Sequence, residues 1–484
     1  MSNTNKLPRR RILVLSVAIV VTALITMSIT ALLINILERK NEGSDKFTKV
    51  VELTEDTVDP AVWGQNFPIQ YEQTLKTKEM TPTVYGGSTK VAHKPTDKDP
   101  RTFVSSSRVE EDPRLKVMWD GYPFAVDYRH ARGHEYMLED QRLTRRVTEF
   151  EQPGACLNCH ASTPTIMRKL GDGDVNKGFA KMNKMPYNEV TKLAEHPVSC
   201  LDCHDPKTMN LRVTRPAFIN GIKALKAGEG VKDYDPNRDA TRQEMRSFVC
   251  GQCHVEYYFK GKEEKTLTFP WNNGLNIDDI WQYYKENPHV DFVHAGTGAK
   301  ILKAQHPEFD IWSNSIHADN GVSCSDCHMP YERNGAKKTS NHQLQSPLLN
   351  INASCMTCHK STEEEMKNRV VNIQDRFIHS RDQAFDSLTQ FVHKLEAAIK
   401  DGTATQEQIE QAREYQNKAS FYLDYVYSEN SYGFHAPAYI HRIIQDSLDA
   451  SRKGMLVLDG AKPDQLGPSD ITNNNTKEIK QRGH

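Results

Sequence analysis

The chain has 484 residues, enough for two or three ordinary domains. Its 62 Lys and Arg residues nearly balance its 63 Asp and Glu residues, and the resulting net charge of −1 argues against a polybasic nucleic-acid binder and against an acidic disordered chain. Hydrophobic residues make up 37%, below the usual share of about 45–50%. We therefore expect part of the interior to be filled by something other than side chains.

An apolar segment at residues 12–37 lies near the amino end. It contains 26 residues without a charge and follows a basic segment, residues 1–11, that ends in three arginines. A bilayer-spanning helix needs about 20 apolar residues, whereas a cleavable signal peptide has an apolar core of only about 7–15. No small-residue cleavage site follows, so the pattern predicts an uncleaved signal anchor.

A repeated cysteine motif dominates the middle of the chain. Residues 38–100 are polar and read as a tether and wrapping segment, whereas residues 101–360 contain all ten cysteines. Each cysteine belongs to a C-x-x-C pair that is followed at once by histidine, and the uneven gaps between pairs exclude a sequence-repeat array. The five motifs comprise Cys156, Cys159 and His160; Cys200, Cys203 and His204; Cys250, Cys253 and His254; Cys324, Cys327 and His328; and Cys355, Cys358 and His359.

The C-x-x-C-H pattern is the attachment signature of c-type haem, with two thioether bonds and an axial histidine. A zinc ribbon does not require a histidine after each pair, and a disulfide framework would not repeat one fixed spacing. Five motifs with no cysteine left over predict a penta-haem cytochrome c, mainly α with little β structure and a haem-packed core. Because c-type haem is attached after export, residues 41–484 are expected on the periplasmic or extracellular face of the cytoplasmic membrane.

Long helices are predicted at residues 361–460. Ser361 and Thr362 offer capping hydroxyls before three glutamates, and helical periodicity then continues to about Lys400. Asp401 and Gly402 interrupt it, and further helices are expected at about 406–428 and 437–458. The pattern suits a plain bundle and a dimerisation stalk equally, and the polar tail at 461–484 is expected to be loose.

Stretches around the motifs resemble the catalytic subunit of cytochrome c nitrite reductase, the ammonia-forming penta-haem enzyme. The third motif continues as H-V-E-Y-Y-F at 254–259, and K-A-Q-H-P-E follows at 303–308. Residues 119–124 and 132–134 belong to the same combination. The resemblance covers about residues 100–460, and the order and rough spacing of the haem motifs agree with it.

The resemblance implies roles for the matching residues. Arg146, Tyr257 and His306 would form the active site, with Arg145 as the neighbouring alternative to Arg146. A calcium site would lie beside the catalytic haem. Calcium is a hard cation that prefers oxygen donors, and the matching residues offer them. Its ligands would be Glu256 and Gln305 through their side chains and Tyr257 and Lys303 through backbone carbonyls.

The resemblance also implies which haems have a second histidine as their distal axial ligand. His134 would complete the third haem, His342 the second, His317 the fifth and His435 the fourth, counted in chain order. The first haem then has no distal ligand and becomes the reaction centre. Many family members carry lysine in place of His160, so this chain resembles the subgroup with histidine there. Imidazole is a different axial donor from an amine, and the identity of the axial ligand changes the reduction potential of the haem.

The expected reaction is the six-electron reduction of nitrite to ammonium, with hydroxylamine as an alternative substrate. Cationic Arg146 and His306 would stabilise the anion, while His306 and Tyr257 would relay protons. The family implies a homodimer and a membrane-bound tetrahaem quinol dehydrogenase as electron donor. Two other functions compete: a non-catalytic multihaem electron carrier, and a multihaem enzyme of hydroxylamine oxidation or sulfur-oxyanion reduction.

Overall fold

The computed structural model describes residues 9–43, 49–335, 337–462 and 465–466. Helices account for 56% and strands for 7%, which confirms the mainly α expectation. Most of the tail predicted at 461–484 and of the basic segment at 1–11 lies outside the described residues. The described strands form two-stranded antiparallel sheets: β1 (Lys90–Ala92) with β2 (Phe103–Ser105), β3 (Tyr258–Lys260) with β4 (Thr266–Thr268), β5 (Phe292–Val293) with β6 (Lys300–Ile301), and β7 (Tyr331–Asn334) with β8 (Lys337–Ser340).

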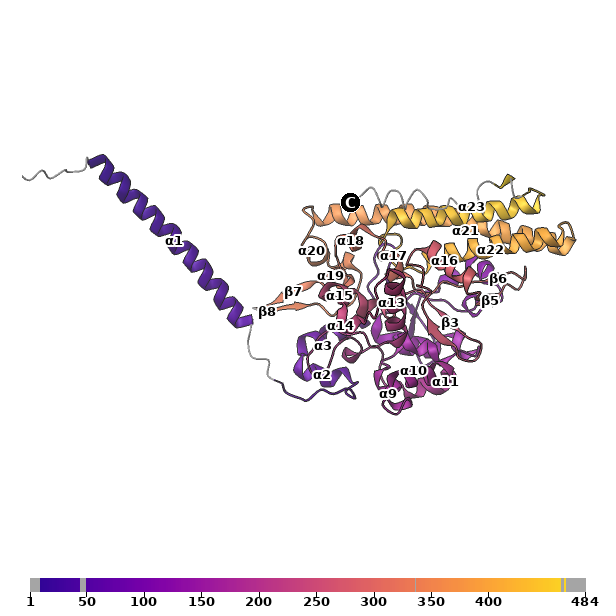
Figure 1. Ribbon diagram of the computed structural model, residues 1–484, viewed down its shortest axis with the longest axis horizontal. Helices are drawn as coiled ribbons and strands as arrows, with labels where there is room; N and C mark the ends of the chain where they lie inside the picture. Colours follow the sequence, from indigo (N-terminus) through magenta and orange to yellow (C-terminus); the bar gives the residue numbers. More distant parts are fainter. Residues whose placement is uncertain (1–8, 44–48, 336, 463–464, 467–484) are drawn as a thin grey trace, which may run out of the picture.

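Helix α1 (Arg9–Gly43) stands away from the rest of the protein (Figure 1). Its stretch Leu13–Leu37 has a mean hydropathy of 2.6, and none of it is buried against the protein. A stretch of this length and composition can cross a bilayer, although a signal sequence has the same properties.

The segment at 38–100 has more regular structure than its polar composition suggests. It contains α2 (Pro60–Asn66), α3 (Pro68–Leu75) and η1 (Lys76–Lys78). Both α-helices begin with proline at a first-turn position, where the missing N–H costs nothing. Asp59 caps α2, and Trp63 is only 1% exposed, so one buried aromatic side chain holds this segment to the body.

The body consists of short helices, and the haem motifs lie on or directly after five of them. These are α8 (Leu157–His160), α12 (Cys200–Cys203), α15 (Arg242–Gly251), α19 (Cys324–His328) and α20 (Ile351–Ser354). The other short helices are α4 (Arg108–Glu111), α5 (Arg114–Met118), α6 (Met137–Leu143), α7 (Arg145–Thr148), α9 (Pro164–Leu170), α10 (Val175–Lys184), α11 (Tyr187–Val190), α13 (Pro216–Gly228), α14 (Pro236–Asp239), α16 (Ile277–Glu286), α17 (Glu308–Trp312) and α18 (Ile316–Asp319), with 3-10 turns η2 (Pro123–Ala125), η3 (His134–Tyr136), η4 (Gly154–Cys156), η5 (Thr191–Leu193) and η6 (Pro347–Leu349).

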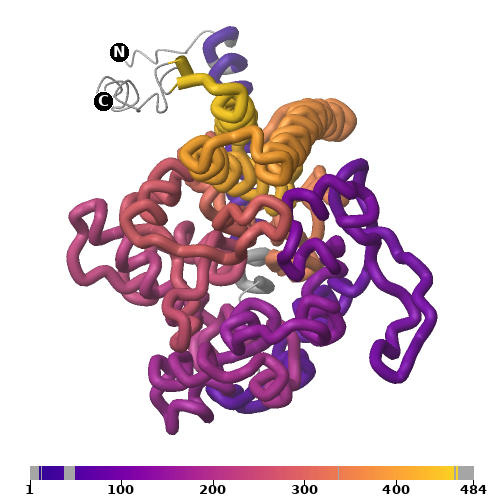
Figure 2. Tube along the Cα trace, turned by 90° about the vertical axis from the view of Figure 1, so that its right-hand side faces the viewer, coloured from indigo at the N-terminus to yellow at the C-terminus, as the bar shows by residue number. Residues whose placement is uncertain are grey.

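Three long helices cover one side of this body (Figures 1 and 2). They are α21 (Glu363–Asp401), α22 (Gln406–Tyr427) and α23 (Pro437–Leu458), close to the predicted ranges. Thr362 and Glu365 form the capping box of α21, and Gly402 ends it in the left-handed conformation. Residues 419–427 of α22 are all buried, so the helix packs against its neighbours on every side.

Candidate functional site

Four histidine pairs bring a motif histidine opposite a histidine from elsewhere in the chain. The ring centres are 6.3 Å apart for His254 with His134 and for His328 with His435. They are 6.4 Å apart in the pairs His204 with His342 and His359 with His317. Two metal–imidazole bonds of about 2 Å, extended to the ring centres, span about 6 Å. The spacing therefore fits an iron between the rings of each pair, as expected for bis-histidine haem.

The motif loops also lie next to one another. The thiols of Cys159 and Cys253 lie close enough to shift each other's pKa, as do those of Cys250 and Cys324. All ten cysteines are free of disulfides, and nine are half-buried, while Cys358 is exposed. The first, third and fourth motifs thus form one continuous cluster, an arrangement that suits electron transfer between neighbouring haems.

His160 differs from the other four motif histidines. In the described chain, no second imidazole stands opposite it at the 6.3–6.4 Å found for the four pairs. Its Nδ1 lies 3.2 Å from the carbonyl oxygen of Met137, which orients the ring in the way usual for an axial ligand. A haem on this motif would therefore have a histidine on one side only.

The structure favours Arg146 over Arg145 at this centre. The side chain of Arg145 is 57% exposed and forms an ion pair of 2.6 Å with Glu149. The guanidinium of Arg146 lies 4.2 Å from the ring centre of Phe124, and its charge acts on Cys156 and His160. Only the second of these two arginines faces the first haem motif.

Tyr257 and His306 both lie near residues of the first motif. Burial lowers the pKa of His306 to about 4, and the charge of nearby His160 contributes to the same shift. Burial also raises the pKa of Tyr257 well above its usual value, with Cys156 and Cys159 adding to the effect. Burial therefore favours the neutral imidazole of His306, and the proposed cationic form would be favoured by a bound anion.

The four residues matched to a calcium site meet around Glu256, which is fully buried. Its Oε2 accepts a hydrogen bond of 2.7 Å from the N–H of Gln305, whereas its Oε1 has no hydrogen-bond partner among the described residues. Burial raises the pKa of this carboxyl well above its usual value. A buried carboxylate with one unbonded oxygen fits a cation, and the oxygen donors fit calcium.

The side chain of Lys303 points away from this group. Its Nζ lies 3.0 Å from the carboxylate of Asp424, while its carbonyl oxygen accepts a hydrogen bond of 3.2 Å from the side-chain amide of Gln305. Lys303 therefore offers only its carbonyl to a cation, as the resemblance implied. Asp310, which the sequence reasoning missed, accepts a hydrogen bond of 2.9 Å from the N–H of Glu256 and so positions it.

Tyr122 is a second residue that sequence reasoning did not single out. Its ring packs between Phe124, with centres 5.4 Å apart, and Phe292, at 4.6 Å. Burial raises the pKa of Tyr122 well above its usual value, and Cys156 and Arg146 act on the hydroxyl. Tyr122 lies within residues 119–124, one of the stretches that resemble the family. That resemblance is the sequence feature from which Tyr122 could have been identified.

Comparisons with known proteins identify a family and a solved structure of similar fold. The family model of cytochrome c552 matches residues 59–482. A cytochrome c-552 of Parabacteroides distasonis is 38% identical over 72% of this chain and 68% of its own length, and one of Bacteroides fragilis is 35% identical over 88% and 81%. Among solved structures, the catalytic subunit of cytochrome c nitrite reductase from Desulfovibrio desulfuricans, described with two calcium sites, superposes with a TM-score of 0.73 at 30% identity, over 87% of this chain and 90% of that one.

Proposed function

We propose that this chain, which belongs to the cytochrome c552 family, reduces nitrite to ammonium at a haem held by Cys156, Cys159 and His160. The observation that carries the proposal is the contrast between four facing histidine pairs and a fifth motif histidine that has no such partner among the described residues. Haem iron with a free axial position binds a small anion and passes electrons to it, whereas iron between two imidazoles is suited to electron transfer alone. Nitrite nitrogen requires six electrons to reach ammonium, and five neighbouring haems would store and supply them.

Arg146 would bind the anion, because its guanidinium is always charged and its charge already acts on the first motif. His306 is neutral in this buried site, and a bound anion favours its protonated form. His306 would therefore take up a proton together with nitrite and donate it to the departing oxygen. Tyr257, whose hydroxyl stays protonated because burial raises its pKa, would be a second donor.

Calcium would be held by Glu256 and Gln305 through their side chains and by Tyr257 and Lys303 through carbonyl oxygens. A cation there neutralises the buried carboxylate and adds positive potential beside the anion site. Since Gln305 directly precedes His306, fixing Gln305 also fixes the position of the proposed proton donor.

The partners follow from the family and from α1. The enzyme would be a homodimer that pairs through α21–α23, held at the cytoplasmic membrane by α1, with its haem domain outside. A tetrahaem quinol dehydrogenase or a similar membrane-bound donor would supply the electrons. The apolar stretch Leu13–Leu37 supports the membrane location, and the long helices support the dimer.

The test uses purified protein carrying its haems, with reduced viologen as the electron source. We expect one ammonium for each nitrite consumed. Arg146→Ala should lower kcat/KM for nitrite by about tenfold or more, since a charged hydrogen bond to substrate contributes about 1.5–3 kcal/mol. Arg145→Ala is the matched control and should leave the rate unchanged, because its pair with Glu149 is exposed. A wild-type protein that forms no ammonium and has only low-spin haems would instead be an electron carrier.

A further inference from the structure

Two carboxylates lie against the Nδ1 atoms of histidines that we assign as haem ligands. The Glu429 side chain is fully buried, and its Oε1 lies 2.6 Å from Nδ1 of His435, the distal ligand proposed for the fourth haem. Oε2 of Glu308, 11% exposed, lies 3.7 Å from Nδ1 of His254, the motif ligand of the third haem. Neither carboxylate is assigned to the proposed nitrite or calcium sites, but the charge of Glu308 also acts on His306.

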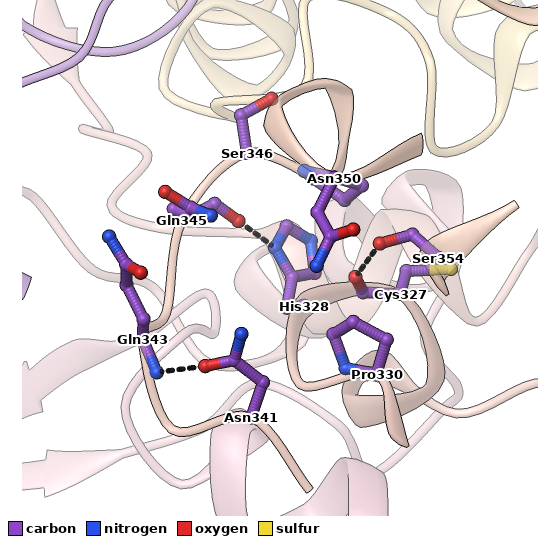
Figure 3. A pocket seen from close by; sticks show the side chains of 10 residues that line it. Cys327, His328, Pro330, Asn341, Gln343, Gln345, Ser346, Asn350 and Ser354 are labelled. Atoms are coloured by element: carbon purple, nitrogen blue, oxygen red, sulfur yellow. Dashed lines mark hydrogen bonds between the residues drawn. The ribbon is translucent and has the colours of Figure 1, made fainter. Parts of the chain in front are cut away.

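Other assigned ligands have neutral acceptors at the same ring position. The Nδ1 atoms of His160, His204 and His328 lie 3.2, 2.9 and 3.1 Å from the backbone carbonyls of Met137, Met209 and Gln345. Figure 3 shows the Nδ1 of His328 directed at the carbonyl of Gln345. Nδ1 of His342 lies 2.8 Å from the carbonyl of Ser340. The third and fourth haems are thus distinguished by a charged group behind one ligand.

One short loop after α22 holds both carboxylates in place. The N–H and hydroxyl of Ser431 donate to the two oxygens of Glu429 at 2.9 and 2.7 Å. The side-chain amide of Asn430 donates to Oε1 of Glu308 at 2.5 Å, and its oxygen accepts from the guanidinium of Arg108 at 2.8 Å. These bonds hold Glu429 through both of its oxygens, including the Oε1 that faces His435, and they hold Glu308 through the oxygen that does not face His254.

Nδ1 of His435 and Oε2 of Glu308 have no hydrogen-bond partner in the described chain, so both contacts are electrostatic and act through the charge of the carboxylate. A negative charge beside a ligand imidazole, in surroundings of low dielectric constant, favours the ferric form of the iron over the ferrous form. This effect lowers the reduction potential of the haem concerned.

We propose that Glu429 and Glu308 are positioning residues that lower the potentials of the fourth and third haems. This inference rests on the ligand assignments of the proposed function. Because the thiols of Cys159 and Cys253 interact, the third motif adjoins the first. A lower potential at the third haem favours passage of its electron to the first haem, which is reduced as the third is oxidised.

The test is a spectroscopic redox titration of the haem-loaded protein and its Glu429→Gln variant. Gln keeps the shape and a neutral acceptor, so we expect one low-spin haem to shift to higher potential while the other four stay in place. The expected change in its reduction equilibrium is at least about tenfold, which is about 59 mV for one electron. Glu308→Gln should produce a smaller upward shift of a different low-spin haem, because its separation of 3.7 Å is longer.

Glu332→Gln is the matched control. Glu332 accepts hydrogen bonds from Asn341 and Asn350, which line the pocket around His328 in Figure 3. This variant removes one negative charge that is bonded to Asn341 and Asn350 and contacts no ligand Nδ1 in the described chain, so its potentials should shift much less than those of Glu429→Gln. Unchanged potentials in Glu429→Gln with full haem content, or an equal shift in Glu332→Gln, would overturn the proposal.

His435→Ala separates failure of this inference from failure of the ligand assignment. Conversion of one low-spin haem to high-spin supports the assignment, and an unmoved potential in Glu429→Gln then overturns the carboxylate effect alone. If the haem spectrum does not change in His435→Ala, both the assignment and the inference are wrong. Ammonium formation is measured separately and reports on the nitrite reaction.

Discussion

Gly133 determines where His134 lies. Its φ is 98°, in the left-handed region that side-chain-bearing residues avoid, and an added Cβ would lie 2.1 Å from the carbonyl oxygen of Thr77. We expect Gly133→Ala to shift the backbone of His134 and to weaken its bond to the third haem. The measurement is electron paramagnetic resonance, in which a second high-spin haem should appear.

Gly173 provides the control for this substitution. Its φ is 97°, nearly the same, but no atom of the described chain lies within 4 Å of an added Cβ. Gly173→Ala should lower the free energy of unfolding by about 1–2 kcal/mol, the cost of a left-handed backbone conformation for a residue with a Cβ. It should leave the haem spectrum unchanged. If both variants retain wild-type spectra, Gly133 does not control the position of His134.

His306 and Tyr257 are the proposed proton donors. His306→Asn or Tyr257→Phe should keep five haems but lower nitrite reduction by a factor on the order of 10²–10⁴, the range of general acid–base groups. The check is turnover with reduced viologen alongside haem quantification. His393→Asn is a suitable control, because that side chain is 59% exposed and pairs with Glu396. Wild-type turnover in both site variants would contradict the assigned roles.

At the scale of elements, α1 is the helix whose fate in the mature protein matters most. Its apolar stretch of 25 residues is about 37 Å long as a helix, longer than a hydrocarbon core of about 30 Å. We predict that the mature protein keeps α1 and sediments with membranes, with the haem domain facing outward. Amino-terminal sequencing decides this, and a start beyond Leu37 would show that α1 is a signal peptide. A variant with a cleavable leader in place of residues 1–43 should be released in soluble form.

At the scale of the whole molecule, the ligand arrangement predicts a mixed haem population. One haem in five should be high-spin or carry only water on its open side, and four should be low-spin with two imidazoles. This prediction rests on His160, whose ring faces no other imidazole in the described chain, whereas the other four motif histidines each face one. Electron paramagnetic resonance of the oxidised protein tests this, and five low-spin bis-histidine centres would rule out nitrite binding at the first haem.

The sequence by itself determined the features that depend on local chemistry. Five C-x-x-C-H motifs indicate c-type haem because both thiols and the ligand are neighbours in the chain. The three long helices were predicted to within about two residues, since their caps at Thr362 and Gly402 and their periodicity are local signals. The roles of His306 and Glu256 came from resemblance to a family and did not follow from local pattern.

Local sequence pattern alone does not show which distant residues meet in the tertiary structure. The histidine counts left the pairing open and the resemblance supplied it, and the structure brings the rings of His435 and His328 face to face although 107 positions separate them. The sequence does not distinguish Arg145 from Arg146 because both are arginines. Helix α7 directs Arg145 toward Glu149 and Arg146 toward the first motif. Glu429 belongs to no motif, and Glu308 ends the stretch 303–308 without a role that the sequence assigns to it. Their significance arises from burial beside an imidazole, which depends on the packing of the α22 loop against residues more than a hundred positions away.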